Sequence, residues 1–289
     1  MEQARGMVRY YRGAAGDVHR KALDPAKYVP RVSIPESDNE PWEPLELTAA
    51  DFPALCIGDL QVPFHDEDVV AMAIERGREM KAKTVIIMGD FGDYYQLSHF
   101  LRDPRKRDFP AEAQMCRDII AEIRRALPKA RIIWKKGNHE FRLDAYIMRQ
   151  APELFGLDVL SFKSVYQLDK YRVELVDDKR LIRYKQLFLL HGHEYRGGMN
   201  SPVNPARTLF LKAKRSAAEW HFHRSNAHTD KAINDDITTT WSVGCLCGLH
   251  PEYMPLNDWQ HGFAEIYVDE YGEWRFKNRK IRNYRYDES

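Results

Sequence analysis

The sequence predicts an α/β fold, because short apolar runs alternate with amphipathic segments along the chain. The runs at 54–58 and 84–88 are typical of strands buried on both faces. The segments at 66–82 and 111–127 place apolar residues at helical spacing. This alternation favours a largely parallel or mixed sheet that is covered by helices.

The predicted elements follow one another from residue 52 in a strand–loop–helix order. The first part of the chain is expected to form strands at 54–58, 84–88, 131–134 and 186–190. Asp66 or Asp68 is a suitable N-cap for the first helix, and Pro128 ends the second. The C-terminal part is expected to form strands at 238–246, 263–268 and 273–279, with a turn at 270–272.

Residues 1–51 differ from the rest of the chain. Met1–Arg31 carries seven Lys or Arg against three acids, whereas Val32–Asp51 carries six acids and no Lys or Arg. Prolines at 30, 35, 41 and 44 interrupt the second half of the segment. Such a segment lacks the apolar pattern of an independent core. We therefore expect an extended arm at 1–51 and a single domain at 52–289.

The composition indicates a soluble globular protein, with 44% hydrophobic and 30% charged residues. A net charge of +1 gives no overall attraction to nucleic acid or membrane, so any such attraction must be local. The apolar runs are too short to span a bilayer, and no signal peptide is visible at the N-terminus. Four cysteines make no disulfide framework, and Cys245-Leu246-Cys247 is interpreted as strand packing. These features fit a protein of the reducing cytoplasm. If a phage encodes the protein, this is the cytoplasm of the host cell.

Metal-ligating side chains recur in a fixed order along the chain, each at or near the end of a predicted strand. They occur in Asp59-Leu60-Gln61, Gly89-Asp90-Phe91-Gly92-Asp93, Gly137-Asn138-His139-Glu140, His191-Gly192-His193 and His221-Phe222-His223. Any one of these motifs can be ordinary turn chemistry. Carboxylate, amide and imidazole groups are ligands of divalent metals, and strand ends converge at one edge of an α/β sheet. Together they predict a binuclear metal hydrolase.

These motifs resemble the calcineurin-like metallophosphoesterase superfamily, whose pattern is Asp-x-His, Gly-Asp-x-x-Asp, Gly-Asn-His-Asp/Glu, a later His, and Gly-His-x-His. The resemblance covers roughly residues 52–270, and the contexts at 136–142 and 241–245 are most similar to phage- and bacterium-type members. It implies two mixed β-sheets flanked by helices, an αββα sandwich. It also implies two divalent metal ions.

The resemblance assigns the metal ligands residue by residue. Asp90 would bridge the two ions; one site would be completed by Asp59, Gln61 and His223, and the other by Asn138, His191 and His221. Gln61 stands where the family has His, and its oxygen donor favours Mn²⁺, with Zn²⁺, Fe or Ni²⁺ as alternatives. Because Trp220 replaces a family Gly, His228 is an alternative to the His221/His223 pair. His193 is expected beside the ligands.

The chemistry that the resemblance implies is phosphoester hydrolysis by a metal-activated hydroxide. His139 is the candidate general acid, oriented by Glu140 or Asp93. A basic, aromatic-flanked loop suggests a phosphodiester in DNA, RNA or a nucleotide, bound by Tyr94, Arg105, Lys106 and Arg107. A phosphomonoesterase or protein phosphatase is the alternative within the class. A metal-bound nucleic-acid-binding module with little turnover is the alternative outside it.

Overall fold

The computed structural model describes residues 35, 37–38, 42–100, 103, 105, 108–177, 179–195 and 203–286. Trp42–Ser289 forms one compact unit, and the fold below is that of this unit. Within the described residues, no helix is both long and apolar enough to cross a membrane.

A seven-stranded mixed sheet has the strand order β13-β12-β11-β2-β3-β4-β5. Its parallel half consists of β2 (Ala54–Ile57), β3 (Thr84–Ile87), β4 (Arg131–Lys135) and β5 (Val173–Val176). Its antiparallel half consists of β11 (His261–Val268), β12 (Trp274–Arg282) and β13 (Arg285–Tyr286). This sheet carries the first three metal-ligand motifs at the ends of β2, β3 and β4.

A six-stranded mixed sheet has the order β1-β6-β7-β8-β10-β9. Its strands are β1 (Leu45–Glu46), β6 (Ile182–Tyr184), β7 (Leu187–Leu190), β8 (Ala217–Glu219), β9 (Asn226–Lys231) and β10 (Ile237–Ser242). The neighbours β7 and β8 run parallel, so that their carboxyl ends, which precede His191 and His221, lie at the same edge.

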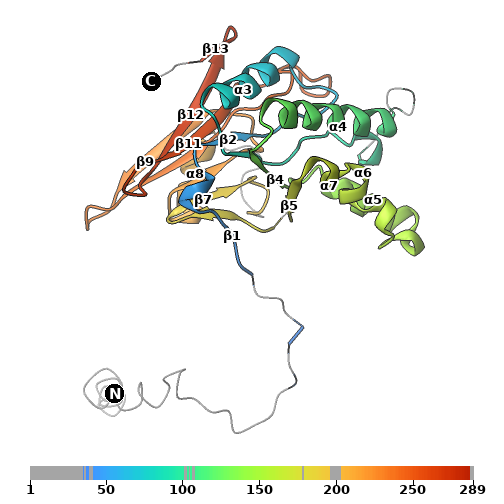
Figure 1. Ribbon diagram of the computed structural model, residues 1–289, viewed down its shortest axis with the longest axis horizontal. Coiled ribbons are helices and arrows are strands. Elements are labelled where there is room, and N and C mark those ends of the chain that lie inside the picture. The colour runs from blue at the N-terminus through green and yellow to red at the C-terminus, as the bar shows by residue number, and fades with distance from the viewer. Residues whose placement is uncertain are drawn as a thin grey trace, which may run out of the picture. The chain divides into compact units, whose positions relative to one another are not determined.

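Helices cover the outer faces of the sheets (Figure 1). The α-helices are α3 (Glu67–Glu79), α4 (Phe109–Ala126), α5 (Phe141–Gln150), α6 (Phe162–Val165), α7 (Leu168–Tyr171) and α8 (Pro205–Ala213). Short 3₁₀ helices are η1 (Ala49–Asp51), η2 (Tyr95–Leu97), η3 (Pro152–Leu154) and η4 (Asp158–Leu160). The Asp66 carboxylate caps α3 by accepting the Val69 N–H at 3.1 Å. Asp66 is therefore the N-cap of the two that the sequence offered.

The layers follow from the two-residue period of the strands. In β2, Leu55 and Ile57 enter the core beneath α3 and α4, whereas Ala54 and Cys56 enter a second core between the sheets. Trp220, after β8, is fully buried in that second core. A smaller cluster joins α8 to the six-stranded sheet. Two mixed sheets flanked by helices are therefore confirmed.

The structure shortens one of the predicted strands. The predicted strand at 238–246 ends at Ser242. Beyond it, Gly244 passes so close to Gln260 that a Cβ there would lie 2.3 Å from the Gln260 carbonyl oxygen. Cys245 and Cys247 lie beyond β10, where both are buried and each forms an isolated β-bridge, Cys245 with His261 and Cys247 with His65. In the predicted arm, 1–34 lies outside the described residues, and Leu45–Glu46 pairs with β6. An arm ending at residue 51 remains a prediction.

Candidate metal centre

Five strand ends bring the predicted ligands together. Asp59 and Gln61 follow β2, Asp90 follows β3, and Asn138 follows β4. From the other sheet, His191 follows β7, and the pair His221 and His223 follows β8. The site is thus assembled at the carboxyl edges of parallel strands from both sheets, as ligand sites in α/β proteins generally are.

The backbone at the ligands is unusual. Five of these non-glycine residues have left-handed backbone angles, with φ between 47° and 67°: Asp59, Gln61, Asp90, His221 and His223. This conformation costs on the order of 1–3 kcal/mol at a non-glycine residue and is found mostly at functional sites. It is held by backbone hydrogen bonds across the strand ends, including Asp59 N–H to the Gly89 carbonyl (3.0 Å) and Gln61 N–H to the Asp90 carbonyl (2.9 Å).

Two glycines allow the loops after β3 and β4 to approach each other. Gly89 has φ +92°, and a Cβ there would lie 2.7 Å from the Gly137 Cα. A Cβ on Gly137 would lie 2.3 Å from the Asp90 Oδ1. Any larger residue at 137 would therefore displace the carboxylate that the sequence assigns to both metals.

Asp90 lies at the centre of one group of ligands. Its Oδ2 lies 3.3 Å from His191 Nε2, and its Oδ1 accepts the backbone N–H of His139 at 2.9 Å. His191 Nε2 also lies 3.2 Å from Asn138 Oδ1. Ligand atoms of Asp90, His191 and His221 all lie within 4.8 Å of one another, which is close enough to share one ion.

Asp59 organises the second group. Its Oδ2 accepts the backbone N–H of His221 at 2.9 Å, and its Oδ1 lies 3.6 Å from His223 Nε2. Gln61 Nε2 lies 3.3 Å from the same imidazole nitrogen. Asp59 Oδ1 and His221 Nδ1 are buried and have no hydrogen-bond partner among the described residues. Buried polar atoms of this kind are rare unless an ion or water completes them, so the residues fit a metal.

The electrostatics of these residues point the same way. Burial by itself lowers the pKa of His191, but the Asp90 carboxylate outweighs burial and raises that pKa to about 10. Burial likewise lowers the pKa of His223, and Asp59 is the main group that raises it to about 10. Each carboxylate therefore holds a cation beside it. A divalent ion would replace the imidazole protons in that role.

His139 lies beside Asp90 with both ring nitrogens engaged. Its Nδ1 lies 3.0 Å from the Asp93 carbonyl oxygen, and Arg142 Nη2 lies 3.0 Å from its Nε2. Because a guanidinium only donates, Nε2 is assigned as the acceptor and Nδ1 as the proton donor. Burial lowers the pKa of His139 to about 4, against the raising effect of Asp90. Sequence reasoning missed Arg142, although it directly follows the Gly-Asn-His-Glu-Phe string.

Glu140 has a different part from the one expected. Its carboxylate accepts the backbone N–H groups of Asp90, Phe91 and Gly137 at 2.7–2.9 Å, and the Trp134 indole N–H at 3.3 Å. The ring of His139 contacts Asp93 and Arg142 and lies 3.7 Å from Asp90 Oδ2. The side chain of Glu140 thus joins the β3 loop to the β4 loop, and the Asp93 carbonyl oxygen lies within hydrogen-bond distance of the His139 ring.

The remaining predicted residues are divided. Tyr94 is fully buried and packs between Phe109 and Tyr166, so the structure assigns it to the core instead of to a substrate surface. The side chain of Arg105 is 86% exposed and is paired with Asp103 at 2.8 Å. Lys106 and Arg107 lie outside the described residues.

Two further candidate histidines, His193 and His228, lie outside the ligand groups described above. The ring of His193 lies 5.2 Å from that of His191, and its Nδ1 lies 3.7 Å from Glu194. The alternative ligand His228 lies on β9 with its ring 5.0 Å from that of Phe210 on α8. In contrast, His221 and His223 both contact Asp59.

Comparison with known proteins adds the family. The sequence model of the calcineurin-like phosphoesterases matches residues 52–244, more than half of the chain. The chain belongs to this family. Family members bind divalent metals, and the residues described above include groups suited to that purpose. Comparison with curated protein sequences gave no match.

Two solved structures are similar to the chain. The phosphoesterase Yfce from E. coli is 11% identical with a TM-score of 0.37, over 78% of this chain and 99% of that one. Vps29 from Chaetomium thermophilum is 12% identical with a TM-score of 0.37, over 80% of this chain and 97% of that one.

Proposed function

We propose that this protein is a phosphodiesterase that hydrolyses nucleic acid or nucleotides with two bound divalent ions. The observation that carries the proposal is the convergence of seven candidate ligand side chains from both sheets. Among them, buried Asp59 Oδ1 and His221 Nδ1 have no hydrogen-bond partner among the described residues. Such atoms are costly to bury unless an ion or water satisfies them. A calcineurin-like family match supports the reaction class.

The ligands divide between two ions. Asp59, Gln61 and His223 would hold one ion; Asn138, His191 and His221 would hold the other, and Asp90 would bridge them. A half-turn of the terminal amide would present the oxygen of Gln61 to the first ion. That oxygen and the carboxylates of Asp59 and Asp90 give the first site more hard oxygen donors than a site of imidazoles alone. Because Mn²⁺ favours oxygen donors, we propose it as the metal.

When bound, such a pair of ions supplies Lewis acidity for attack on phosphorus. His139 would donate a proton to the leaving oxygen. Its Nε2 accepts from Arg142, so acid catalysis requires that the ring take up a second proton. The negative charge of a bound phosphoester favours that uptake, because it raises the pKa of a neighbouring imidazole. Asp93 would keep the ring in place through its carbonyl oxygen.

A pocket of about 260 Å³ supports a nucleic-acid or nucleotide substrate. It is lined by Ser98, His99, Phe100, Tyr146, Arg149 and Gln150. The rings of His99 and Phe100 lie 4.1 Å apart, and Phe100 is 65% exposed. Aromatic rings beside an arginine suit a stacked base and its phosphate. Both walls belong to segments that follow candidate site residues, the loop after Asp93 and helix α5 after His139.

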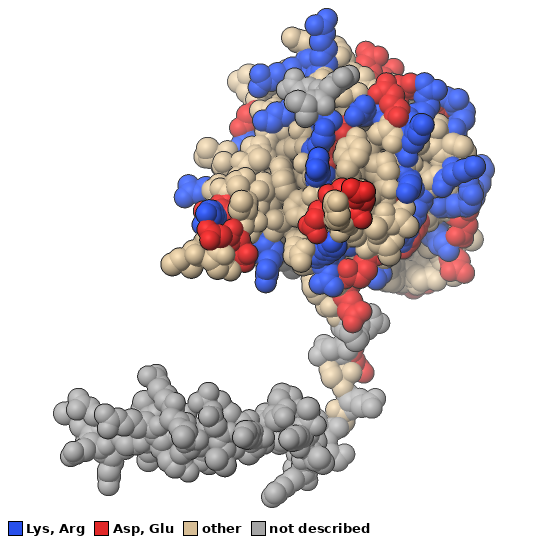
Figure 2. Space-filling model, turned by 60° about the vertical axis from the view of Figure 1, so that its left-hand side comes forward, with Lys and Arg blue, Asp and Glu red and all other residues tan. Residues whose placement is uncertain are grey.

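The positive charge that would attract the substrate is confined to a local surface, because the net charge of the chain is only +1. Figure 2 shows Lys and Arg side chains interspersed with Asp and Glu on the visible face of the compact unit. An overall positive field therefore does not steer a polyanion to the protein. Arg105 and, by sequence, Lys106 and Arg107 would contact the phosphate backbone of the substrate.

The test is a Mn²⁺-supplemented assay that compares bis-nitrophenyl phosphate, nitrophenyl phosphate, and labelled single- and double-stranded DNA. We expect hydrolysis of the diester and of DNA. Turnover of the monoester alone would favour a phosphomonoesterase or protein phosphatase, and tight DNA binding without cleavage would favour a binding module. Replacing Arg105, Lys106 and Arg107 by Ala should weaken DNA binding and its salt dependence far more than turnover of the small diester.

A further inference from the structure

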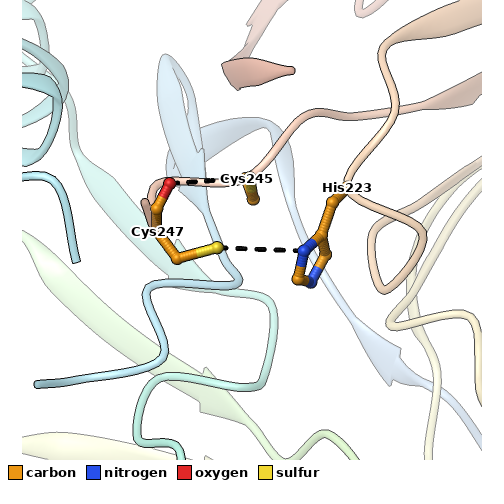
Figure 3. Close-up of side chains that lie close together, drawn as sticks. All are labelled: His223, Cys245 and Cys247. Atoms are coloured by element: carbon orange, nitrogen blue, oxygen red, sulfur yellow. Dashed lines mark hydrogen bonds between the residues drawn. The ribbon is translucent and has the colours of Figure 1, made fainter. Parts of the chain in front are cut away.

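Two cysteines and a histidine converge behind the proposed first metal site (Figure 3). Cys245 and Cys247 lie on one segment after β10, and His223 lies on the segment after β8. Sγ atoms of both cysteines and a ring nitrogen of His223 all lie within 4.8 Å of one another. All three residues are buried: Cys245 is 0% exposed, Cys247 1% and His223 3%.

The imidazole of His223 presents a different nitrogen to each group. Its Nε2 faces Asp59 and Gln61, at 3.6 and 3.3 Å. Its Nδ1 lies 3.8 Å from Cys247 Sγ. The thiol pair is therefore on the opposite side of the ring from the ligands that the calcineurin-like pattern supplies.

The hydrogen bonds of sulfur that connect these groups are long, at 3.6–3.9 Å. The Cys245 thiol has carbonyl oxygens at 3.6 Å (Gln260) and 3.9 Å (Cys247), and thiols are weak donors. A tetrahedral ion with Zn–S near 2.3 Å and Zn–N near 2.0 Å separates sulfur and nitrogen ligands by about 3.5 Å, and two sulfurs by about 3.8 Å. The 3.8 Å between Cys247 Sγ and His223 Nδ1 is close to the first of these values.

We propose that His223, Cys245 and Cys247 form a separate site for a thiophilic metal ion such as Zn²⁺. Thiolates select soft or borderline ions, whereas the proposed catalytic centre has oxygen and imidazole donors that suit Mn²⁺. The two sites share His223. A neutral imidazole offers only one lone pair to a metal, so a thiophilic ion at Nδ1 competes with the ion at Nε2.

The competition gives the site a functional consequence. Binding of the thiophilic ion should lower the apparent affinity of the first catalytic site for Mn²⁺, and Mn²⁺ should lower the affinity for the thiophilic ion by the same factor. Excess Zn²⁺ should therefore inhibit a Mn²⁺-loaded enzyme, and variants without the thiols should be inhibited less.

The test is a Cd²⁺ titration of the full chain under reducing conditions, monitored by the ultraviolet charge-transfer absorption of thiolate–cadmium bonds. Cadmium bound only at the oxygen and imidazole ligands gives no such absorption. We expect it to appear in the wild type, to be lost in Cys245→Ser and Cys247→Ser, and to persist in Cys116→Ser, whose thiol lies in the core beneath α4. Circular dichroism of each variant checks folding.

Asp90→Asn separates this proposal from the proposed phosphoesterase activity. It removes the bridging carboxylate and leaves the thiol cluster intact, so it should abolish hydrolysis and keep the cadmium–thiolate absorption. Absence of that absorption in the folded wild type would overturn the thiophilic site whether or not the protein hydrolyses phosphodiesters. Absorption that survives in the folded double variant Cys245→Ser/Cys247→Ser would overturn it as well.

Discussion

The ammonium group of Lys135 lies 2.8 Å from a carboxylate oxygen of Glu194, and the Lys135 side chain is fully buried. Glu194 in turn accepts the backbone N–H groups of His191 and Gly192 at 2.9 and 2.6 Å. Burial by itself raises the pKa of Glu194, but Lys135 and the neighbouring histidines lower it to about 2. The ion pair thus fixes the backbone of a proposed metal ligand from the end of β4.

Lys135→Met should strongly destabilise the protein. Removing one partner of a buried ion pair leaves the other charge uncompensated, which typically costs about 3–5 kcal/mol. Lys185→Met is the matched control, because its pair with Glu273 has side chains 38% and 70% exposed and should contribute less than about 1 kcal/mol. Urea unfolding of both variants measures the difference. Equally small decreases in the free energy of unfolding of both variants would show that the Lys135–Glu194 pair does not stabilise the fold.

Glu265→Gln should lower stability in a pH-dependent way. Burial alone would raise the pKa of Glu265, but hydrogen bonds from Arg279 and Arg76 lower it below the usual 4.5. A group whose folded-state pKa is lowered contributes stability above its unfolded pKa and loses it as pH falls through the folded value.

The difference in unfolding free energy between wild type and Glu265→Gln should therefore be largest at neutral pH and shrink below about pH 4. Chemical denaturation at several pH values measures it, with exposed Glu270→Gln as the control. A difference that stays constant down to acid pH would contradict the predicted contribution of the Glu265 charge.

Gly137→Ala should lower the affinity of the folded protein for Mn²⁺. The added Cβ would lie 2.3 Å from Asp90 Oδ1, so the carboxylate must move away from the centre. Gly248→Ala is a control, because its Cβ would meet only the Phe64 carbonyl oxygen, at 3.4 Å. Isothermal titration with Mn²⁺ compares the two. Unchanged Mn²⁺ affinity in folded Gly137→Ala would count against Asp90 as a ligand.

Asp90→Asn should lose both ions, since its carboxylate is the proposed bridge and the neutral amide attracts cations less. The metal content of the purified variant after incubation with Mn²⁺ provides the measurement. Exposed Asp118→Asn on α4 should keep the wild-type content. Two ions per chain in Asp90→Asn would remove Asp90 from the bridging position.

His139→Ala should slow hydrolysis of substrates with poor leaving groups by about 10²–10⁴-fold, the usual effect of removing a positioned acid. The loss should be much smaller for a nitrophenyl diester, whose leaving group needs little protonation. Rates on bis-nitrophenyl phosphate and on DNA give the comparison. Equal losses on both substrates would indicate that His139 positions other groups and donates no proton.

Several features were predictable because they are local. The strand at 84–88 and the Asp66 cap follow from neighbouring residues alone, and β3 and the cap appear where they were expected. The family of the chain follows from the ordered motifs, and the family match confirms it. The assignments of individual ligands and catalytic residues stay predictions.

Other features depend on contacts between distant segments and were not predictable. Tyr94 lies in a loop rich in basic and aromatic residues, yet its ring fills the core against Tyr166. Glu140 adjoins His139 in sequence, yet its carboxylate turns to the backbone of the β3 loop. Cys245 and Cys247 meet His223 only because β8 and β10 are neighbours in the sheet.

The origin of the ligands in both sheets has a consequence for unfolding. Apolar side chains such as Ile86 and Leu189 pack between the two sheets, and the Lys135–Glu194 ion pair joins them near the site. Ions bound between the strand ends would tie the sheets at one edge, so that neither opens without releasing metal. Amide hydrogen exchange in β3 and β8 should then slow together when Mn²⁺ binds, and the two sheets should unfold as one cooperative unit.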